Sequence, residues 1–231
     1  MPRWLQSHLF SLIFGLIGAI FLLVGLVILW FGILSNRQIN AVESLPLFNS
    51  TQLVGQAKPG TKAVVEGKVS ERNPLHAEGF VAYVRRRYLG ERCTDSGDEE
   101  RCDQVWIEDE SLKPELWLDL SDGRIQLANT DYVIQNAPDV RETTETLVED
   151  QTLRYEGFRI GSPIFANGTV AQPGAEAAAF NAALIYGGDR TSYFAAQREA
   201  ADILFFLGLT FSLVGTVLAT IAIIVAFVWG T

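Results

Sequence analysis

The stretch Leu9–Leu34, with the sequence LFSLIFGLIGAIFLLVGLVILWFGIL, contains no ionisable side chain. A second stretch of the same character, Ile203–Trp229, reads ILFFLGLTFSLVGTVLATIAIIVAFVW. Each is longer than the roughly 20 apolar residues that an α-helix needs to cross a bilayer. A cleaved signal peptide would have a shorter apolar run followed by small residues, whereas the first stretch ends with bulky ones such as Trp30 and Phe31. The sequence therefore predicts two transmembrane helices.

The charged residues lie almost entirely between these two stretches. The segment 35–202 holds all 27 acidic residues and all but one of the 18 basic residues, which gives it a net charge of −10. An acidic domain of this kind is expected to be soluble and to bind no nucleic acid. The predicted organisation is a short N-terminal tail (1–8), a first transmembrane helix (9–34), one soluble domain (35–202), a second transmembrane helix (203–229) and a C-terminal end (230–231).

The short flank before the first helix favours one orientation in the membrane. Arg3 and the α-amine lie on its N-terminal side, and positive charge close to a helix end tends to stay in the cytoplasm. A first helix inserted in this way places the soluble domain outside the cytoplasm, in a periplasm or lumen. We therefore expect a multi-pass integral membrane protein with an extracytoplasmic domain.

Small residues recur along one face of each apolar stretch. Helices in a bilayer associate by close backbone approach, which seams of Gly, Ala and Ser permit. A spacing that averages 3.5 residues implies a left-handed crossing. Either the seams join the two helices to each other or to another membrane protein, or Gly and Ala are simply frequent in membrane helices. The seam residues are Ser11, Gly15, Gly18, Gly25 and Gly32 in the first helix and Gly208, Ser212, Gly215, Ala219, Ala222 and Ala226 in the second.

The soluble segment has the pattern of a β-rich domain. Lys62–Val69 is rich in β-branched residues and follows the turn residues Pro59 and Gly60, so it predicts a strand. The Ala-rich run Ala175–Ile185 instead predicts a helix. The fold class is thus a membrane protein with two terminal transmembrane helices flanking one β-rich α+β soluble domain. Further predicted strands are Phe80–Leu89, Glu115–Leu120, Arg124–Leu127, Thr152–Ile160 and Ile164–Val170, with a hairpin turn at Asp122 and Gly123 and helical extensions at Asn36–Ser44 and Ser192–Ala201.

The two cysteines of the chain, Cys93 and Cys102, lie in a stretch whose charges match across a hairpin. When the cysteines are placed opposite each other, one register brings opposite charges together at several positions further from the turn. Each such pair contributes a few tenths to about 1 kcal/mol. We therefore predict a disulfide-linked hairpin with cross-strand ion pairs. The predicted opposite residues are Arg92 and Asp103, Leu89 and Trp106, Arg87 and Glu108, Arg86 and Asp109, and Arg85 and Glu110.

A disulfide between Cys93 and Cys102 would close a short loop and stabilise the fold by roughly 2–3 kcal/mol. It would also indicate an oxidising compartment, which agrees with an extracytoplasmic domain. The alternative is two unpaired thiols in a reducing compartment, because sequence alone cannot establish disulfide geometry.

The sequence predicts no catalytic, metal or cofactor site. Two cysteines and two histidines, His8 and His76, are too few and too scattered for a zinc centre. There is no Gly-rich phosphate loop, nucleophile elbow or HExxH motif. The acidic run Glu108–Glu110 could suggest catalytic carboxylates, but we interpret it as the partner of the arginines Arg85–Arg87.

Several short segments, in their order along the chain, resemble the GIDE family of membrane-anchored RING ubiquitin ligases and their bacterial relatives. In that family two transmembrane helices flank a domain called "beside a membrane". The eukaryotic ligases carry a cytosolic RING after the second helix, and no such segment follows here. The resemblance therefore implies a fold, a topology and an interaction role, but no ligase residue. It rests on Leu53–Gly55, Val64–Val69, Gly79–Tyr83, Trp106, Leu118–Ile125, Tyr155–Gly161 and Gly168–Val170.

Three functions are weighed against these features. The first is a non-catalytic interaction protein, a scaffold or accessory subunit that contacts other membrane-protein subunits and the bilayer. The second is a module that senses a lipid or small ligand beside the membrane, which would require a pocket lined by convergent polar groups. The third is an enzyme with an unrecognised site, which a carboxyl group with a strongly shifted pKa in a cleft would favour.

Overall fold

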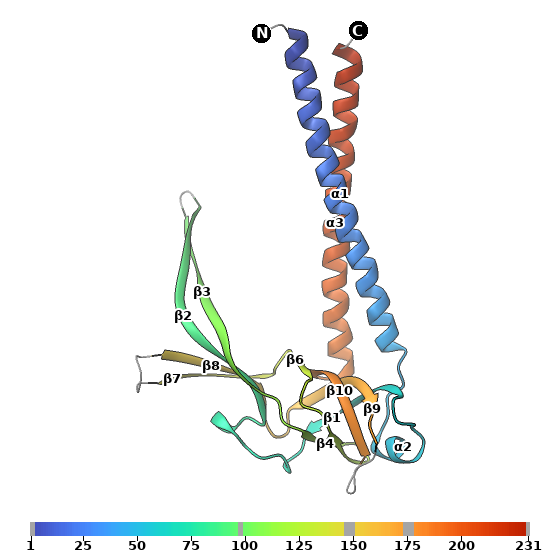
Figure 1. Cartoon of the computed structure of the whole chain (residues 1–231), viewed down its shortest axis with the longest axis vertical. Coiled ribbons are helices and arrows are strands. Elements are labelled where there is room, and N and C mark those ends of the chain that lie inside the picture. The colour runs from blue at the N-terminus through green and yellow to red at the C-terminus, as the bar shows by residue number, and fades with distance from the viewer. Residues whose placement is uncertain (1–2, 97–98, 146–150, 173–177, 230–231) are drawn as a thin grey trace. The chain divides into compact units, whose positions relative to one another are not determined.

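Two compact units make up the protein in the computed structural model, which describes residues 3–96, 99–145, 151–172 and 178–229. One unit is built from the long helices α1 (Arg3–Glu43) and α3 (Arg190–Trp229), and the other, Leu45–Tyr193, contains the β-strands (Figure 1). Both helices are long and apolar enough to cross a membrane. The predicted extension of the first helix beyond its apolar stretch is confirmed, and α1 ends shortly before Pro46.

A closed five-stranded barrel forms the centre of the β-rich unit. Going around it, the order is β1, β4, β5, β10 and β9, and every neighbouring pair is antiparallel except β5 and β10, which are parallel. This is the Greek-key connectivity of an OB-type barrel. The strands are β1 (Lys62–Val69), β4 (Leu116–Leu120), β5 (Gly123–Leu127), β9 (Pro163–Val170) and β10 (Ala178–Gly187).

The main hydrophobic core lies with these strands. Fully buried side chains come from each of them, and burial of each large apolar side chain contributes about 1.5–3 kcal/mol. Tyr132, in the connection after β5, is also fully buried, and its hydroxyl donates to the carbonyl of Pro114 over 2.8 Å. The core includes Val65, Leu116, Leu118, Ile125, Leu127, Ile164 and Phe180.

Side-chain amides complete the backbone pairing of the barrel where the regular ladder is interrupted. Strand β10 pairs first with β5 and further along with the short strand β6 (Val133–Gln135). Between these two pairings, the side-chain amide of Asn129 bonds to the main chain of β10. Its Oδ1 accepts from the Ala182 N–H over 2.8 Å, and its Nδ2 donates to the Ala182 carbonyl over 2.7 Å. Asn73 does the same for both main-chain groups of Trp117. Because buried backbone groups need partners, these asparagines are part of the barrel wall.

A short helix is attached to the turn between β4 and β5. Helix α2 (Ser50–Gly55) begins with a capping box formed by Asn49 and Gln52. Its first two N–H groups, those of Ser50 and Thr51, donate to the carboxylate of Asp122. These backbone hydrogen bonds, that from Thr51 first, lower the pKa of Asp122.

A second, four-stranded antiparallel sheet is built from the connections between the barrel strands. Its order is β3, β2, β8, β7, and a 3-10 turn (Ala77–Gly79) precedes β2. A small aromatic cluster of Phe80, Tyr83, Leu153 and Tyr155 is buried at its base. The strands are β2 (Ala82–Ser96), β3 (Glu99–Leu112), β7 (Asp139–Glu145) and β8 (Gln151–Phe158).

The helix predicted at Ala175–Ile185 is wrong from Ala178 onward, because Ala178–Gly187 is strand β10, while residues 175–177 lie outside the described part of the chain. Alanine favours helices in isolation, but tertiary context overrides this preference here. Strand β10 lies between β9 on one side and β5 and β6 on the other. Ala178, Ala179 and Ala182 are buried there, where small side chains allow neighbouring elements to pack closely. The other predicted strands correspond to β1, β2, β4, β5, β8 and β9, and their ends agree within a few residues. The exception is β2, which continues beyond the predicted end at Leu89 to Ser96.

We predict that Asn129→Ala lowers the free energy of unfolding by about 1–3 kcal/mol, because it leaves the main chain of Ala182 without two partners. Denaturant unfolding of the full chain in mild detergent, followed by tryptophan fluorescence, measures this change. Gln126→Ala, on the outer face of β5, is the matched control and should change stability by less than about 0.5 kcal/mol. Equal effects of the two substitutions would contradict a structural role for Asn129.

Candidate functional site: the β2–β3 arm and the helix seam

The β2–β3 hairpin extends well beyond the sheet from which it starts. Strand β2 pairs with β3 from Tyr83 to Ser96, but it pairs with β8 only as far as Arg87. Beyond that point β3 is the one strand paired with β2 among the residues that the structure describes. We call the two segments 88–96 and 99–107 the distal arm.

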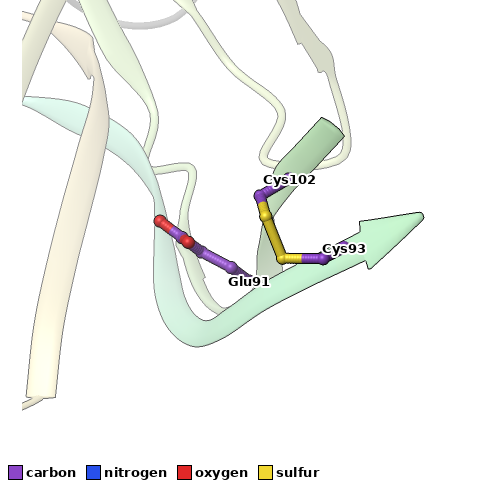
Figure 2. A group of neighbouring side chains, drawn as sticks. All are labelled: Glu91, Cys93 and Cys102. Atoms are coloured by element: carbon purple, nitrogen blue, oxygen red, sulfur yellow. A yellow bond between two sulfur atoms is a disulfide. The ribbon is translucent and has the colours of Figure 1, made fainter. Parts of the chain in front are cut away.

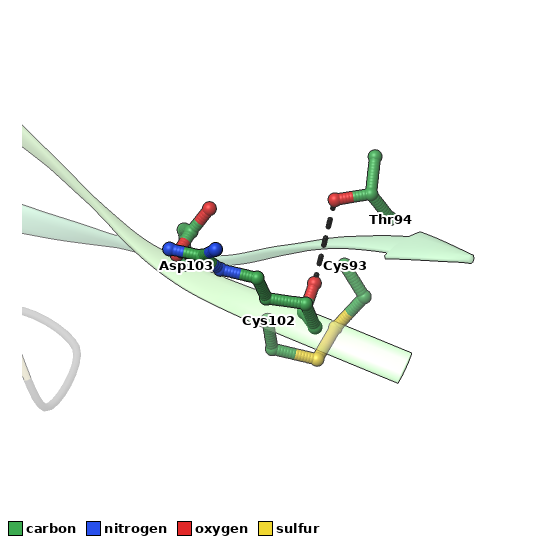
Figure 3. The surroundings of a disulfide bond; sticks show 5 residues. Cys93, Thr94, Cys102 and Asp103 are labelled. Atoms are coloured by element: carbon green, nitrogen blue, oxygen red, sulfur yellow. Dashed lines mark hydrogen bonds and ion pairs between the residues drawn. A yellow bond between two sulfur atoms is a disulfide. The ribbon is translucent and has the colours of Figure 1, made fainter. Parts of the chain in front are cut away.

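A disulfide joins the two strands of the distal arm, as predicted (Figure 3). Cys93 and Cys102 are directly opposite in the ladder, and their sulfurs are 2.00 Å apart. Both residues are exposed. Next to them, the Thr94 hydroxyl donates to the Arg101 carbonyl over 3.4 Å. The disulfide therefore links the arm covalently near its tip.

The predicted hairpin register is correct at its two ends and wrong between them. Arg92 faces Asp103 and Arg85 faces Glu110, as expected. Between these positions are two irregularities, with Leu89 as an extra residue on β2 and Asp109 as an extra residue on β3. The two insertions cancel, so the register shifts by one residue and then returns. The shifted pairs are Tyr88 with Trp106, Arg87 with Ile107 and Arg86 with Glu108, in place of the predicted Leu89 with Trp106, Arg87 with Glu108 and Arg86 with Asp109.

The bulge on β3 gives Asp109 the central position in an ion-pair network. The residue as a whole is exposed, yet its side chain is only 13% exposed. Arg85 donates to it through Nε at 3.1 Å and also pairs with Glu110 at 2.9 Å, while Arg87 approaches Asp109 at 3.7 Å. Glu110 in turn accepts the Tyr83 hydroxyl at 2.6 Å. Burial, followed by this bond to Glu110, raises the pKa of Tyr83 to about 12.

A second row of charged side chains lies on the face of the sheet opposite to Arg85 and Arg87, because successive side chains along β2 and β8 point to alternate faces. Arg86 pairs with Glu156 on β8 at 3.0 Å, and not with Asp109 as predicted. Arg154 on β8 pairs with Glu142 on β7 at 2.6 Å, and its guanidinium lies 4.1 Å from the centroid of the Trp106 ring. The sheet is therefore joined to the base of the distal arm by a cation–π contact, worth about 0.5–1 kcal/mol at an exposed site.

The sequence contained one signal for this irregular register that the prediction did not use. Gly90 interrupts an otherwise β-forming run and adopts a φ of +116°, a conformation that favours glycine. An isolated glycine within a strand pattern indicates a bulge. Asp109, by contrast, has no such marker, and its contact with two arginines follows only from the three-dimensional arrangement.

Glu91 lies beside the disulfide, and one potential ligand atom from each of Glu91, Cys93 and Cys102 lies within 4.8 Å of the others (Figure 2). Metal binding by cysteine requires thiolates. Because the two sulfurs are bonded to each other, these residues are not a metal-ligand set in this state. This is the one such group of His, Cys and acidic residues found within the described parts of the chain.

The predicted small-residue seams of α1 and α3 pack against each other. Buried positions recur every seven residues in both helices. A Cβ added at Gly18 would meet the Ala219 nitrogen at 2.7 Å, and one at Gly215 would meet the Gly18 carbonyl oxygen at 2.7 Å. The seam residues are therefore at backbone contact distance, and the seven-residue repeat agrees with a left-handed supercoil. The buried positions are Gly18, Gly25, Gly32 and Ile39 in α1 and Ala201, Gly208, Gly215 and Ala222 in α3.

Other predicted seam positions lie at the margins of this interface. A Cβ added at Gly15 would meet the Ala222 Cβ at 3.6 Å, an ordinary contact distance, and Ala226 is half-buried. Ser212 lies against Gly25, at one of the closest approaches in the seam. The side chain of Ser11 falls outside the described residues. Where the helices leave the apolar stretch, Arg198 donates to both carboxylate oxygens of Glu43 at 2.7 Å.

Two open hollows lie on the β-rich unit. One, of about 360 Å³, is lined by residues that include Phe48, Gln52 and Glu66. The other, of about 470 Å³, lies over β9 and β10 beside Asp131 and Asn181. Among the residues that line them there is no paired nucleophile and base, and the amide of Asn129 in the second hollow is already bonded to Ala182.

No protein-family model matches the chain, and searches of curated proteins and of solved structures found no significant similarity. The interpretation of the arm and the helix seam therefore rests on their geometry.

We predict that Asp109→Asn destabilises the protein by about 1–2 kcal/mol, because it leaves Arg85 and Arg87 facing each other without their shared carboxylate. Glu108→Gln should change stability by less than about 0.5 kcal/mol, since Arg86, which lies opposite in the ladder, pairs with Glu156. Denaturant unfolding of both variants measures the difference. The regular register would predict similar losses at the two positions, so similar losses would contradict the bulge.

We predict that Gly25→Ala weakens the helix pair by about 1–3 kcal/mol, because the added Cβ would lie 2.5 Å from the Ser212 nitrogen. Gly15→Ala is the matched control, since its Cβ meets only the Ala222 Cβ at 3.6 Å. Both substitutions gain the same helix propensity, so their difference isolates the close contact. Thermal unfolding in mild detergent, followed by circular dichroism at the helix band, should separate them, and identical curves would count against the seam.

Proposed function

We propose that the protein is a membrane-anchored, non-catalytic interaction protein, a scaffold or accessory subunit of a larger membrane complex. The observation that carries this proposal is the distal arm. It extends beyond the support of β8 and is linked by a disulfide near its tip. Its extra residue Leu89 is 57% exposed, and Ile107 is 39% exposed. An ordered, exposed element of this kind suits contact with another protein.

The outer surface of the helix pair supports a position within the bilayer. The seams use the small residues of both helices for contact with each other, and large apolar side chains face outward. Leu23 is 64% exposed and Phe227 is 75% exposed. Apolar surface of this extent is unfavourable in water and favourable in lipid. In this proposal both helices cross the membrane, and their lipid-facing sides provide a second surface for other membrane-protein subunits.

The disulfide supports an extracytoplasmic position for the β-rich unit, in a periplasm or lumen. Disulfides persist in oxidising compartments and are rare in reducing ones. Cys93 and Cys102 are both exposed, so cytosolic reductants would have access to them. An N-terminus in the cytoplasm, as inferred from Arg3, agrees with an extracytoplasmic β-rich unit. We also propose the layout of the GIDE-like proteins, in which two transmembrane helices flank one domain.

A second candidate function is the sensing of a small polar ligand beside the membrane. The hollow over β9 and β10 favours it, because Asp131, Thr169 and Asn181 bring carboxylate, hydroxyl and amide groups to one surface. This proposal is the weaker of the two, because the hollow is open to solvent and the amide of Asn129 is already hydrogen-bonded to Ala182.

We predict that the protein isolated in mild detergent migrates on native gels with other proteins in fixed stoichiometry, which mass spectrometry can identify. Leu89→Ser should remove these partners or reduce their yield at least about tenfold, because it takes an exposed apolar contact from the arm. Val54→Ser, which alters an exposed apolar residue of α2, is the matched control and should retain them.

Recovery of the protein only alone or as a homo-oligomer, across several gentle detergents, would refute the scaffold and favour the ligand sensor. Equal loss of partners in both variants would refute the assignment of the contact to the arm.

A further inference from the structure

The distal arm differs from the rest of the β-rich unit in how it is held. Residues of β2 up to Arg87 pair with β3 on one side and with β8 on the other, whereas from Tyr88 onward β3 is the one strand paired with β2 in the described parts of the chain. An isolated two-stranded hairpin is at best marginally stable in water. Apart from the contact of Arg154 with the Trp106 ring, the order of the described distal arm therefore depends on interactions between its own two strands.

Among the described residues, the strands of the distal arm pair through their backbones up to Ser96 and Glu99, and aromatic side chains pack at its base. The rings of Tyr88 and Trp106 pack with centroids 5.2 Å apart, and Arg154 covers the Trp106 ring from β8. Immediately beyond this pair the ladder is broken by the bulge at Leu89 and Gly90. The contacts near the tip are long and exposed, as in the ion pair between Arg101 and Asp103, whose side chains are 80% and 67% exposed. Exposed pairs of this kind stabilise little.

The disulfide lies on the far side of the bulge from the aromatic pair. It closes the tip of the hairpin and restricts the open states of the distal arm. Both cysteines are exposed, so a dissolved thiol can reach the sulfurs without unfolding the domain. The bond that keeps the distal arm closed is thus also one that a dissolved thiol can reach.

We propose that Cys93–Cys102 is a site of thiol–disulfide exchange with a dithiol reductant, and that its reduction releases the distal arm while the barrel stays folded. One thiolate of the reductant attacks a cysteine sulfur, and the S–S bond breaks with its electron pair on the other cysteine. The second thiolate of the reductant then attacks the mixed disulfide and displaces the first cysteine. The two cysteines gain two electrons and two protons, and the reductant leaves as a cyclic disulfide.

The barrel is expected to be insensitive to this reaction. Its strands are closed by backbone pairing on both sides and by a core that includes no cysteine. The proximal part of β2, Ala82–Arg87, keeps its pairing with β8 and the aromatic cluster around Tyr83. The effect is therefore confined to the distal arm. If the arm is the partner contact of the proposed function, reductant controls that contact.

Hydrogen exchange measured by mass spectrometry on the full chain in mild detergent tests the inference, with dithiothreitol as the reductant. We expect amides of the distal arm to exchange about 10- to 100-fold faster after reduction, from the loop entropy that the disulfide removes. Amides of β9 and of Ala82–Arg87 should be unchanged. The double variant Cys93→Ser, Cys102→Ser is the matched control, and its distal arm should exchange fast with and without dithiothreitol.

Unchanged exchange in the distal arm after complete reduction, verified by thiol alkylation and intact mass, would overturn the inference, as would equal acceleration in β9. The exchange experiment requires no partner, so its outcome is independent of the proposed function. Release of the arm by dithiothreitol, combined with failure to recover any partner from the oxidised protein, would support this inference and refute the scaffold.

Discussion

Three residue pairs between β5 and β10, from Ile125 with Ala178 to Leu127 with Phe180, close the barrel. Without this parallel pairing the five strands would be an open sheet with two exposed edges, and the core side chains of β5 and β10 would lose their enclosure. The pairing continues through Asn129 to β6, so the whole length of β10 has a neighbour on that side. Both connections that form the second sheet start and end on strands of this closed barrel, which fixes the base of the β2–β3 hairpin.

The helix pair is held by a different kind of constraint. In the barrel, burial of large side chains supplies the stability, whereas the helix seam depends on the absence of side chains at positions such as Gly18, Gly25 and Gly215. Close backbone approach is the association mechanism that suits lipid, where burial of apolar groups provides no driving force between helices. Each unit is thus stabilised by contacts within itself. The distal arm is stabilised by neither kind of contact, and we propose it as the contact with a partner.

Local patterns were sufficient to predict the parts of the structure that local rules control. The uncharged stretches, the β-branched run of β1 and the turn at Asp122 all have short-range signals, and the facing cysteines located the hairpin. The failures occurred where a long-range contact decides the outcome. The Ala-rich run forms β10 because it pairs with β9 on one side and with β5 and β6 on the other. Arg86 and Arg87 have other partners than predicted, Glu156 and Asp109, in the stretch where two bulges shift the register. Pairing rules based on a regular ladder cannot anticipate two insertions that cancel.

The central claim is the proposal that the distal arm contacts another protein. Site-specific photo-crosslinking in native membranes tests it most directly, with the photoreactive residue placed at Leu89 in one sample and at Val133, an exposed residue of β6, in another. The account predicts a discrete crosslink from position 89 to a second polypeptide and none from position 133. Crosslinks from position 89 only to lipid or to a second copy of this chain, or the same adducts from both positions, would contradict it.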